Sequence, residues 1–331
     1  MNHHLLVIGE IHRGKIDPTT YEILGATQQL RSKGIEKVGV FLGSGEIKFE
    51  EIQKPLHFGA NYIYGLENPI FDELAFHVSA QLIINTIQKL KPTIIMAAAT
   101  TQGTTLMPYI AAKLHTGLTA DCTGFDIDPA DGTLLQIRPA IGGNIMATIK
   151  TKTYPQMATV RPNTFQPVHG EYSDSMIVIE EDHVSYPSGF LYNEFIEEDH
   201  NLDIAQAKIV CSGGRGLKNS QNFSLIEELS QCLNGCVGGS RVAVEQGWIS
   251  FPHQVGLSGK TISPDFYIAL GISGAIQHLA GMQTSRYIIA INRDPEAQIF
   301  QLADFGIVGD VLEILPQIIK VLKQRKKNEP I

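Results

Sequence analysis

Apolar segments of strand length alternate with amphipathic segments along the first 125 residues of the chain. The predicted strands are 5–8, 37–42, 61–65 and 93–98, and the predicted helices are 21–33, 72–90 and 104–114. Strands and helices that alternate over short connections predict a parallel sheet with helices on both faces. The first half of the chain is therefore predicted to be an α/β domain.

The hydrophobic pattern changes between residues 126 and 160. The runs 143–149 and 156–160 are short, rich in β-formers and bounded by turn residues. This pattern is typical of antiparallel hairpins. We predict that both runs are antiparallel strands added at an edge of the first sheet.

Residues 162–203 are polar and acidic, and the strand–helix alternation resumes at an apolar run, 208–212. We place the domain boundary in this region, giving domains 1–204 and 205–331. A final helix is predicted at about 308–325, where Pro316 should kink or restart it. The predicted fold class is α/β, with two domains of mainly parallel sheet, the second of them doubly wound.

Composition narrows the function classes. A length of 331 residues suits two domains, and a net charge of −8 argues against a nucleic-acid binder, whose surface would be basic. The apolar runs are all shorter than the ~18 residues of a membrane span, and residues 1–4 lack a signal-peptide pattern. Four cysteines without a CxxC pair favour reduced thiols over a metal site. We expect a cytoplasmic protein without a metal or membrane insertion.

Four glycine-rich loops in the second half carry the strongest chemical signal. They are 212–216, 238–241, 254–259 and 271–278. We expect each loop to follow a strand of the parallel sheet, where such sheets bind ligands. Glycine lets backbone N–H groups approach an anion, and Arg215 and Arg241 add cations. The GxGxxG fingerprint is incomplete, so a standard dinucleotide fold is not supported. Together the loops predict a site for a large phosphorylated ligand.

The sequence shows no nucleophile or acid–base constellation, which suits a protein whose chemistry is carried out by a cofactor. His278 follows the glycine turn of the fourth loop. Its spacing leaves two interpretations open, a core histidine or a ligand contact.

The amino-acid sequence of the fourth loop and of the segment after it resembles a known family. GISGAIQHLAGM at 271–282, followed by AINRDPEAQIFQLADFGIVGD at 290–310, is similar to the FAD-binding segment of the electron transfer flavoprotein α subunit. The run TGLTADC at 116–122 is similar to the branch found in anaerobes and nitrogen fixers. The resemblance implies one FAD in the second domain, and a β subunit that carries a second FAD or AMP.

The resemblance also implies roles for individual residues. Arg215, Ser240 and the turn Gly271, Ser273, Gly274 and Ala275 would bind near the pyrophosphate, and Asn292 and Asp310 at the adenosine end. The isoalloxazine ring would be surrounded by Arg241, Gln254, Val255, Gly256, Ser258 and His278, with Gln277 on the same helix turn. Leu257, Thr104, Thr105 and Tyr109 depart from the usual family residues, so contacts at these positions are in doubt.

The resemblance implies electron transfer between a donor, NADH or an acyl-CoA dehydrogenase, and a dehydrogenase or quinone reductase. Simple carriage and bifurcation, with ferredoxin or flavodoxin as a further acceptor, both remain open. An alternative function is an adenine-nucleotide enzyme that uses the first domain. That alternative would need a phosphate loop at 9–14, where the sequence has only one glycine at each end.

Overall fold

The computed structural model describes residues 3–73, 75–140, 145–170, 175–184, 186, 204–205 and 207–328, with side chains as far as residue 325. The chain forms two compact units. Their division falls among residues 187–203, which lie outside the described ranges. The boundary at 204/205 therefore stays a prediction.

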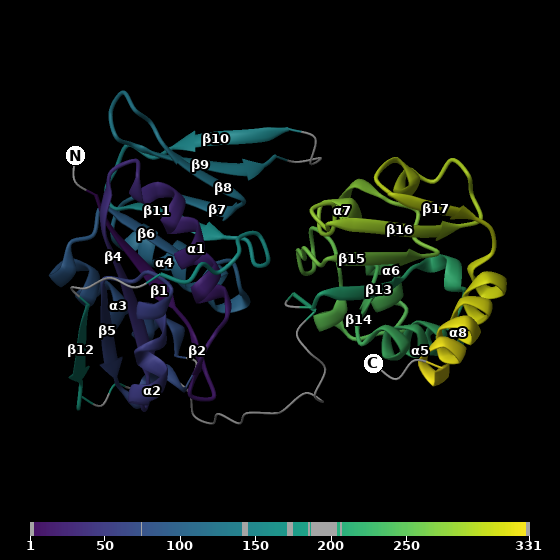
Figure 1. Ribbon diagram of the computed structural model, residues 1–331, viewed down its shortest axis with the longest axis horizontal. Coiled ribbons are helices and arrows are strands. Elements are labelled where there is room, and N and C mark those ends of the chain that lie inside the picture. Colours follow the sequence, from purple (N-terminus) through teal and green to yellow (C-terminus); the bar gives the residue numbers. More distant parts are fainter. Residues whose placement is uncertain are drawn as a thin grey trace. The chain divides into compact units, whose positions relative to one another are not determined.

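The first unit is built on a seven-stranded sheet (Figure 1) in the order β12-β5-β4-β1-β6-β11-β7. Every neighbouring pair is parallel, which confirms the predicted parallel sheet. The strands are β1 (His3–Gly9), β4 (Ile35–Ser44), β5 (Tyr62–Glu67), β6 (Ile94–Ala98), β7 (Leu118–Cys122), β11 (Gln156–Val160) and β12 (Met176–Glu181). A short hairpin, β2 (Ile11–His12) with β3 (Lys15–Ile16), follows the first strand.

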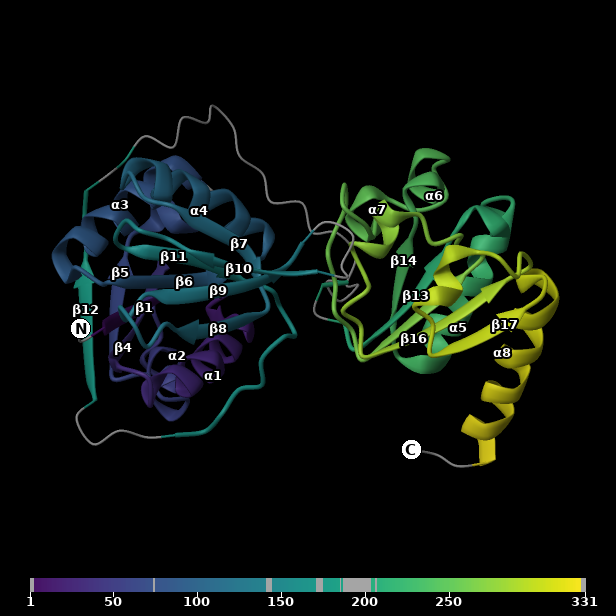
Figure 2. The same cartoon turned by 90° about the horizontal axis from the view of Figure 1, so that it is seen from above.

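Helices cover both faces of this sheet (Figure 2). Alternate residues of β1 point to opposite faces, so Leu5 joins the core under α1 while Leu6 joins the core under α3 and α4. Thr100 begins α4 by accepting a hydrogen bond from the Gly103 amide at 3.0 Å. The α-helices are α1 (Thr19–Arg31), α2 (Phe49–Ile52), α3 (Phe76–Leu90) and α4 (Thr101–Lys113), and the 3₁₀ helices are Lys54–His57 and Pro69–Phe71.

The antiparallel region differs in part from the prediction. Strands β8 (Gly124–Ile127), β9 (Leu134–Pro139) and β10 (Met146–Lys150) form an antiparallel sheet of their own. This confirms antiparallel pairing for the described part of the run 143–149. The prediction for 156–160 is wrong, because β11 is parallel and lies between β6 and β7. All five of its residues are buried, as an interior strand requires.

The second unit is a five-stranded parallel sheet in the order β14-β13-β15-β16-β17. Its strands are β13 (Ile209–Gly213), β14 (Cys236–Gly239), β15 (Phe266–Leu270), β16 (Tyr287–Asn292) and β17 (Phe305–Val308). Its helices are α5 (Ser224–Leu233), α6 (Arg241–Glu245), α7 (Ile276–Leu279) and α8 (Val311–Asn328), with 3₁₀ helices Arg215–Leu217, Gln221–Phe223, Phe251–His253 and Gln298–Gln301. Helix α8 continues through Pro316 without the predicted restart.

Helices α5 and α8 pack together against one face of this sheet (Figure 1). The other face is covered by side chains of the segments around α7, including Ile262, Met282 and Ile299. The chain leaves β13 toward β14 on one side and returns to β15 on the other. The carboxyl ends of β13 and β15 therefore form a topological switch point, where open α/β sheets bind their ligands. The doubly wound prediction is confirmed.

Candidate functional site

A cavity of about 820 Å³ lies at the carboxyl ends of the C-terminal strands. This volume is in the range of small-molecule and cofactor sites. Twelve of the fifteen predicted residues line it: Arg215, Ser240, Arg241, Val255, Gly256, Ser258, Gly271, Ser273, Ala275, Gln277, His278 and Asn292. The structure thus brings together residues from all four predicted loops and, in addition, Asn292, so that the predicted residues lining the cavity span 77 positions, from 215 to 292.

Three predicted residues lie outside this lining. The Gln254 side chain is buried and donates to Ser258 Oγ at 3.1 Å, so it supports a lining residue. Gly274 packs behind the cavity, where a Cβ would come within 2.2 Å of the Ile299 amide. Asp310 begins α8, accepting from the Leu312 amide at 2.9 Å and from Lys218 Nζ at 3.1 Å. The ligand contacts predicted for all fifteen residues stay predictions.

The third loop reaches the cavity differently from the prediction. It follows the 3₁₀ helix Phe251–His253 rather than a strand. Hydrogen bonding attaches it to the end of β14, with the Val255 amide donating to the Gly239 carbonyl at 2.9 Å. The Leu257 amide donates to the Gln277 carbonyl at 2.7 Å, which joins the third loop to the fourth.

Backbone contacts also join the first loop to the fourth. The Gly216 amide donates to the Gly271 carbonyl at 2.9 Å. Gly271 has φ +65°, and a Cβ there would lie 2.8 Å from the Gly216 Cα. A left-handed conformation and a backbone neighbour this close both require glycine. The two glycines therefore allow the loops after β13 and β15 to pack directly on one another.

Two polar residues, Ser240 and Asn292, position the rest of the rim. Ser240 begins α6, and its amide donates to the Gly213 carbonyl at 3.0 Å. Asn292 Nδ2 donates to the Ile272 carbonyl at 2.8 Å, while its Oδ1 accepts from the Asp294 amide at 3.0 Å. These bonds fix the ends of β14 and β16 against the neighbouring loops.

The cavity lining is cationic although the whole chain carries −8. Arg215, Lys218, Arg241 and Arg293 line it, with Asp294 as the one carboxylate among the described lining residues. Arg241 Nε pairs with Glu245 at 2.7 Å, but 69% of the Arg241 side chain remains exposed. Exposed guanidinium groups beside glycine loops suit a phosphorylated ligand.

Lys218, Arg293 and Asp294 are lining residues that the sequence analysis missed. Arg293 and Asp294 directly follow β16, so their position after the carboxyl end of a strand was an available signal. Lys218 has φ +70°, an unusual conformation that turns the chain back after the first loop. Its basic charge close to that loop was the signal available from sequence.

His278 is buried and also lines the cavity, so its position is compatible with both interpretations of the sequence, a core histidine and a ligand contact. It is 7% exposed, and its Nε2 lies 2.8 Å from the Tyr267 hydroxyl. Burial lowers the pKa of His278 to about 4, so the ring is neutral near pH 7. Its other ring nitrogen, Nδ1, is buried and finds no hydrogen-bond partner of good geometry among the described residues.

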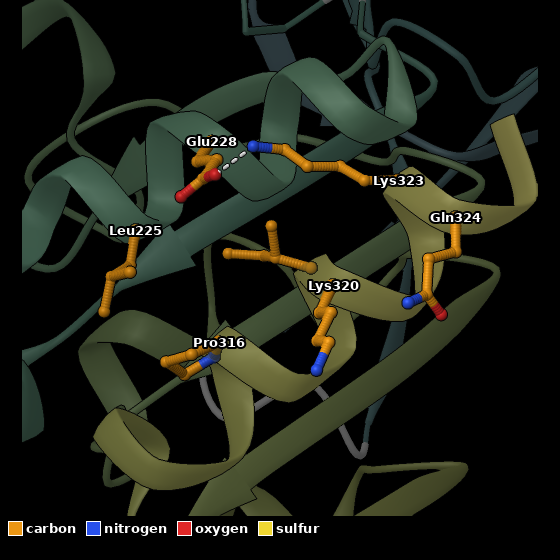
Figure 3. Close-up of a pocket in the computed structure, with 7 residues that line it drawn as sticks. Leu225, Glu228, Pro316, Lys320, Lys323 and Gln324 are labelled. Carbon is orange, nitrogen blue, oxygen red and sulfur yellow. Dashed lines mark hydrogen bonds and ion pairs between the residues drawn. The ribbon is translucent and has the colours of Figure 1, made fainter. Parts of the chain in front are cut away.

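A second hollow lies between α5 and α8 (Figure 3) and measures about 370 Å³. Leu225, Pro316 and Ile319 form apolar walls, and Lys323 forms an ion pair with Glu228 on its rim. None of the predicted site residues lines it. It lacks glycine loops and is less suited than the larger cavity to a phosphorylated cofactor.

The first unit also has a switch point, between β1 and β6, where the alternative function would need a phosphate loop. A buried carboxylate, Glu10, lies at this point, 5% exposed. It accepts from Thr100 Oγ1 at 2.5 Å, and its Oε2 lies 3.3 Å from His12 Nε2. A carboxylate at this place opposes phosphate binding, which weighs against the alternative.

The fold and the cavity together define a nucleotide-binding α/β protein. Two family models match the chain, "Electron transfer flavoprotein domain" over residues 5–183 and "Electron transfer flavoprotein FAD-binding domain" over residues 203–283.

Proteins of this family are similar in sequence to the chain over almost its whole length. It is 42% identical over 328 residues to electron transfer flavoprotein subunit alpha of Thermoanaerobacterium thermosaccharolyticum, covering 97% of this chain and 98% of the relative. It is 41% identical to Protein FixB of Clostridium saccharobutylicum, covering 96% of each. It is 37% identical to lactate dehydrogenase (NAD(+),ferredoxin) subunit LctC of Acetobacterium woodii, covering 96% of this chain and 76% of the relative. The chain belongs to the electron transfer flavoprotein family, as its sequence predicted.

The residues present fit FAD. Four cations and backbone-packed glycines suit its pyrophosphate, and the buried Nδ1 of His278 is a polar atom that a ligand can satisfy. The described residues contain no cluster of three metal-ligating side chains, and the four cysteines are free thiols. No helix within the described ranges has both the length and the apolar character that crossing a bilayer requires.

Proposed function

We propose that this chain holds one FAD in the C-terminal cavity and acts as the α subunit of a heterodimeric electron transfer flavoprotein. The observation that carries the proposal is the convergence of four glycine loops and four cations on one cavity. All four loops and three of the cations, Arg215, Lys218 and Arg241, lie within the residues that the FAD-binding family model matches. FAD supplies the redox chemistry when bound, and the protein supplies binding, orientation and electrostatics.

The proposed roles follow from position. Arg215 and Lys218 lie on the loop after β13 and bind the pyrophosphate, together with the Ser240 and Ser273 turns. Asn292 lies at the end of β16 and contacts the adenosine end. Arg241, Ser258 and His278 surround the flavin ring, where a guanidinium stabilises the negative charge that reduction adds.

The proposed partner is a β subunit that carries a second FAD or AMP. The donor is NADH or an acyl-CoA dehydrogenase, and the acceptor is a flavoenzyme such as a dehydrogenase or quinone reductase. The relative LctC is named for NAD(+) and ferredoxin, which supports a bifurcating assembly as one form of this function. Simple carriage between two flavoenzymes is the other form.

The test is to co-express the chain with the β subunit encoded in the same genome and to count cofactors in the purified complex. We expect a yellow heterodimer with at least one FAD per complex. Two FADs would support bifurcation, and one FAD with one AMP would support simple carriage. A colourless complex after reconstitution with FAD would contradict the proposal.

The isolated chain is a useful comparison in the same experiment. We expect it to hold FAD more weakly than the complex, because the proposed ring-binding residues Arg241 and Ser258 are exposed in the free chain. A flavin-saturated monomer of equal affinity would contradict the assigned role of the β subunit.

A further inference from the structure

Tyr267 is among the largest fully buried side chains of the described structure, at 0% exposure. It is the second residue of β15 and packs in the core between the sheet and the α7 side of the unit. A phenol that is completely buried costs folding free energy unless its hydroxyl is hydrogen bonded. The position therefore requires an explanation beyond packing.

The Tyr267 hydroxyl is hydrogen bonded to His278 Nε2 at 2.8 Å. The ring centroids are 6.1 Å apart with a tilt of 54°, so the hydroxyl meets the edge of the imidazole rather than its face. Among the described residues this hydrogen bond has good geometry, and the buried Ser212 hydroxyl is a second polar group that acts on the Tyr267 hydroxyl. The bond to His278 joins a core strand directly to a cavity-lining side chain.

The direction of this hydrogen bond follows from what each group has to offer. A tyrosine hydroxyl has one proton to donate, and a neutral imidazole has one acceptor nitrogen and one N–H. If Nε2 carried the proton, the Tyr267 hydroxyl would accept it, and the Tyr267 proton would be left with the Ser212 hydroxyl, which has no hydrogen-bond partner of good geometry. A buried proton left unpaired costs about 1–3 kcal/mol. Donation from Tyr267 to Nε2 avoids this cost. It requires the imidazole proton to be on Nδ1.

We propose that Tyr267 is a positioning residue that holds His278 in the neutral form protonated on Nδ1. Nδ1 is the ring nitrogen that has no hydrogen-bond partner of good geometry in the described structure, and His278 lines the cavity. In this form Nδ1 is a donor rather than an acceptor, which also suits the Val255 backbone that acts on the ring. The inference rests on the proposed function for its consequence, which is that His278 donates toward an electron-rich atom of FAD.

Two further observations agree with a fixed neutral ring. Burial lowers the pKa of His278 to about 4 and raises the pKa of Tyr267, so that neither group is charged near pH 7. The backbone also fixes the ring's position, because the His278 amide donates to the Ala275 carbonyl at 2.8 Å. The hydrogen bond from Tyr267 on β15 then fixes the rotation and the tautomer of the His278 ring.

The first test is ¹⁵N NMR of the full-length chain with labelled histidine, without added FAD. His278 signals are assigned through a His278→Gln variant. We expect the wild type to carry the proton on Nδ1, and Tyr267→Phe to shift the tautomer ratio toward an even mixture, by about tenfold for one lost neutral hydrogen bond. Tyr287→Phe is the matched control, because Tyr287 lies on the neighbouring strand β16 and is 38% exposed.

Two outcomes of this experiment would overturn the proposal. One is a wild-type His278 protonated on Nε2, which needs no variant and so holds even if Tyr267→Phe fails to fold. The other is an unchanged tautomer ratio in a folded Tyr267→Phe chain.

The second test measures the midpoint potential of FAD in the complex with the β subunit. We expect Tyr267→Phe to lower the potential at unchanged FAD stoichiometry, and Tyr287→Phe to leave the potential at the wild-type value. A changed tautomer with an unchanged potential would refute the role toward the cofactor. If the wild-type complex binds no FAD, the proposed function fails, while the NMR result still decides the role of Tyr267.

Discussion

Arg241 shows how a single side chain can prepare the cavity for charge. It lies at the first position of α6, directly after β14, and 69% of its side chain is exposed. Glu245 holds its Nε at 2.7 Å in the structure, one helical turn away. A carboxylate this exposed is a weak partner, so a ligand with a fixed negative charge competes with it readily.

Arg241→Ala should lower the reduction potential of the bound FAD, because a positive charge near the ring favours its reduced, anionic form. For a partly exposed charge worth about 1 kcal/mol, the shift is on the order of 40 mV for one electron. Arg241→Lys should restore part of it, and Ser258→Ala should cause a smaller shift because it removes a neutral group. Spectroelectrochemistry of the FAD-loaded variants measures this. Equal potentials in Arg241→Ala and the wild type would place Arg241 away from the ring.

Arg215→Ala should weaken FAD binding by about 1.5–3 kcal/mol if the guanidinium contacts a phosphate directly. Arg286→Ala is the matched control. Arg286 is a 70% exposed arginine that lies outside the cavity lining, 3.8 Å from the Asp265 carboxylate. Titration of FAD into the deflavinated complex measures both. A loss shared equally by the two variants would point to net charge rather than to a phosphate contact.

These arginines and their neighbours show which residues of the cavity can be predicted from the sequence. Arg215 and Arg241 were predictable because each lies within a glycine loop, so local sequence carries the chemistry. Lys218 has a weaker sequence signal, a basic charge close to the first loop, because its cavity position depends on a backbone with φ +70°. Asp310 is adjacent in space to Lys218 but lies 92 positions away in sequence. Its bond to the Leu312 amide at the start of α8 is local, whereas its position outside the lining depends on tertiary packing.

At the scale of elements, the loops after β13 and β15 are held together by backbone atoms, with Gly216 and Gly271 in direct contact. The resumed alternation of strands and helices predicted β13, but β14 and β17 were not predicted as strands, and the third loop does not follow a strand. The alternation also did not predict the pairing of β11, because a five-residue apolar strand has the same local pattern in either direction. The parallel neighbours of β11 are supplied by residues 94–98 and 118–122, far from it in sequence.

Gly271→Ala should destabilise the C-terminal unit by about 2–5 kcal/mol, which combines about 1–2 for a left-handed alanine with about 1–3 for overpacking. Gly247→Ala is the control, since Gly247 has φ +69° but no atom within 4 Å of the added Cβ. That variant should lose only the conformational part. Denaturant unfolding followed at the C-terminal unit compares them. Equal losses would show that the contact with Gly216 relaxes freely.

At the scale of the whole molecule, each unit carries a titratable group whose pKa is shifted by burial, and the two shifts make stability depend on pH in opposite directions. Burial raises the pKa of Glu22 on α1 to about 7, from an ordinary value of 4.5. Burial lowers the pKa of His278 to about 4, from an ordinary value of 6.5. The stability that Glu22 contributes is complete below pH 4.5 and is lost as pH rises through 7. The stability that His278 contributes is complete above pH 6.5 and is lost as pH falls through 4.

Between pH 4.5 and 6.5 the two contributions should therefore have opposite slopes. The free energy of unfolding of wild type minus Glu22→Gln should fall with rising pH in the N-terminal unit. The same difference for His278→Gln should rise with pH in the C-terminal unit. Hydrogen exchange resolved by unit, measured across pH 4.5–7.5, checks both. Slopes of the same sign for the two variants would contradict the assigned protonation of one of them.

Main-chain contacts between the four loops determine the shape of the cavity, whereas polar side chains determine its charge. The Gly216 and Gly271 contact and the bonds of Val255 and Leu257 use main-chain atoms, whereas Arg215, Arg241 and Ser258 line the cavity and bring polar side chains to the site. Redox tuning can therefore change by point substitution while the scaffold stays constant. Libraries that vary Arg241 and Ser258 and keep the glycines should yield folded carriers that differ in reduction potential. That potential decides which electron donors and acceptors a carrier can serve.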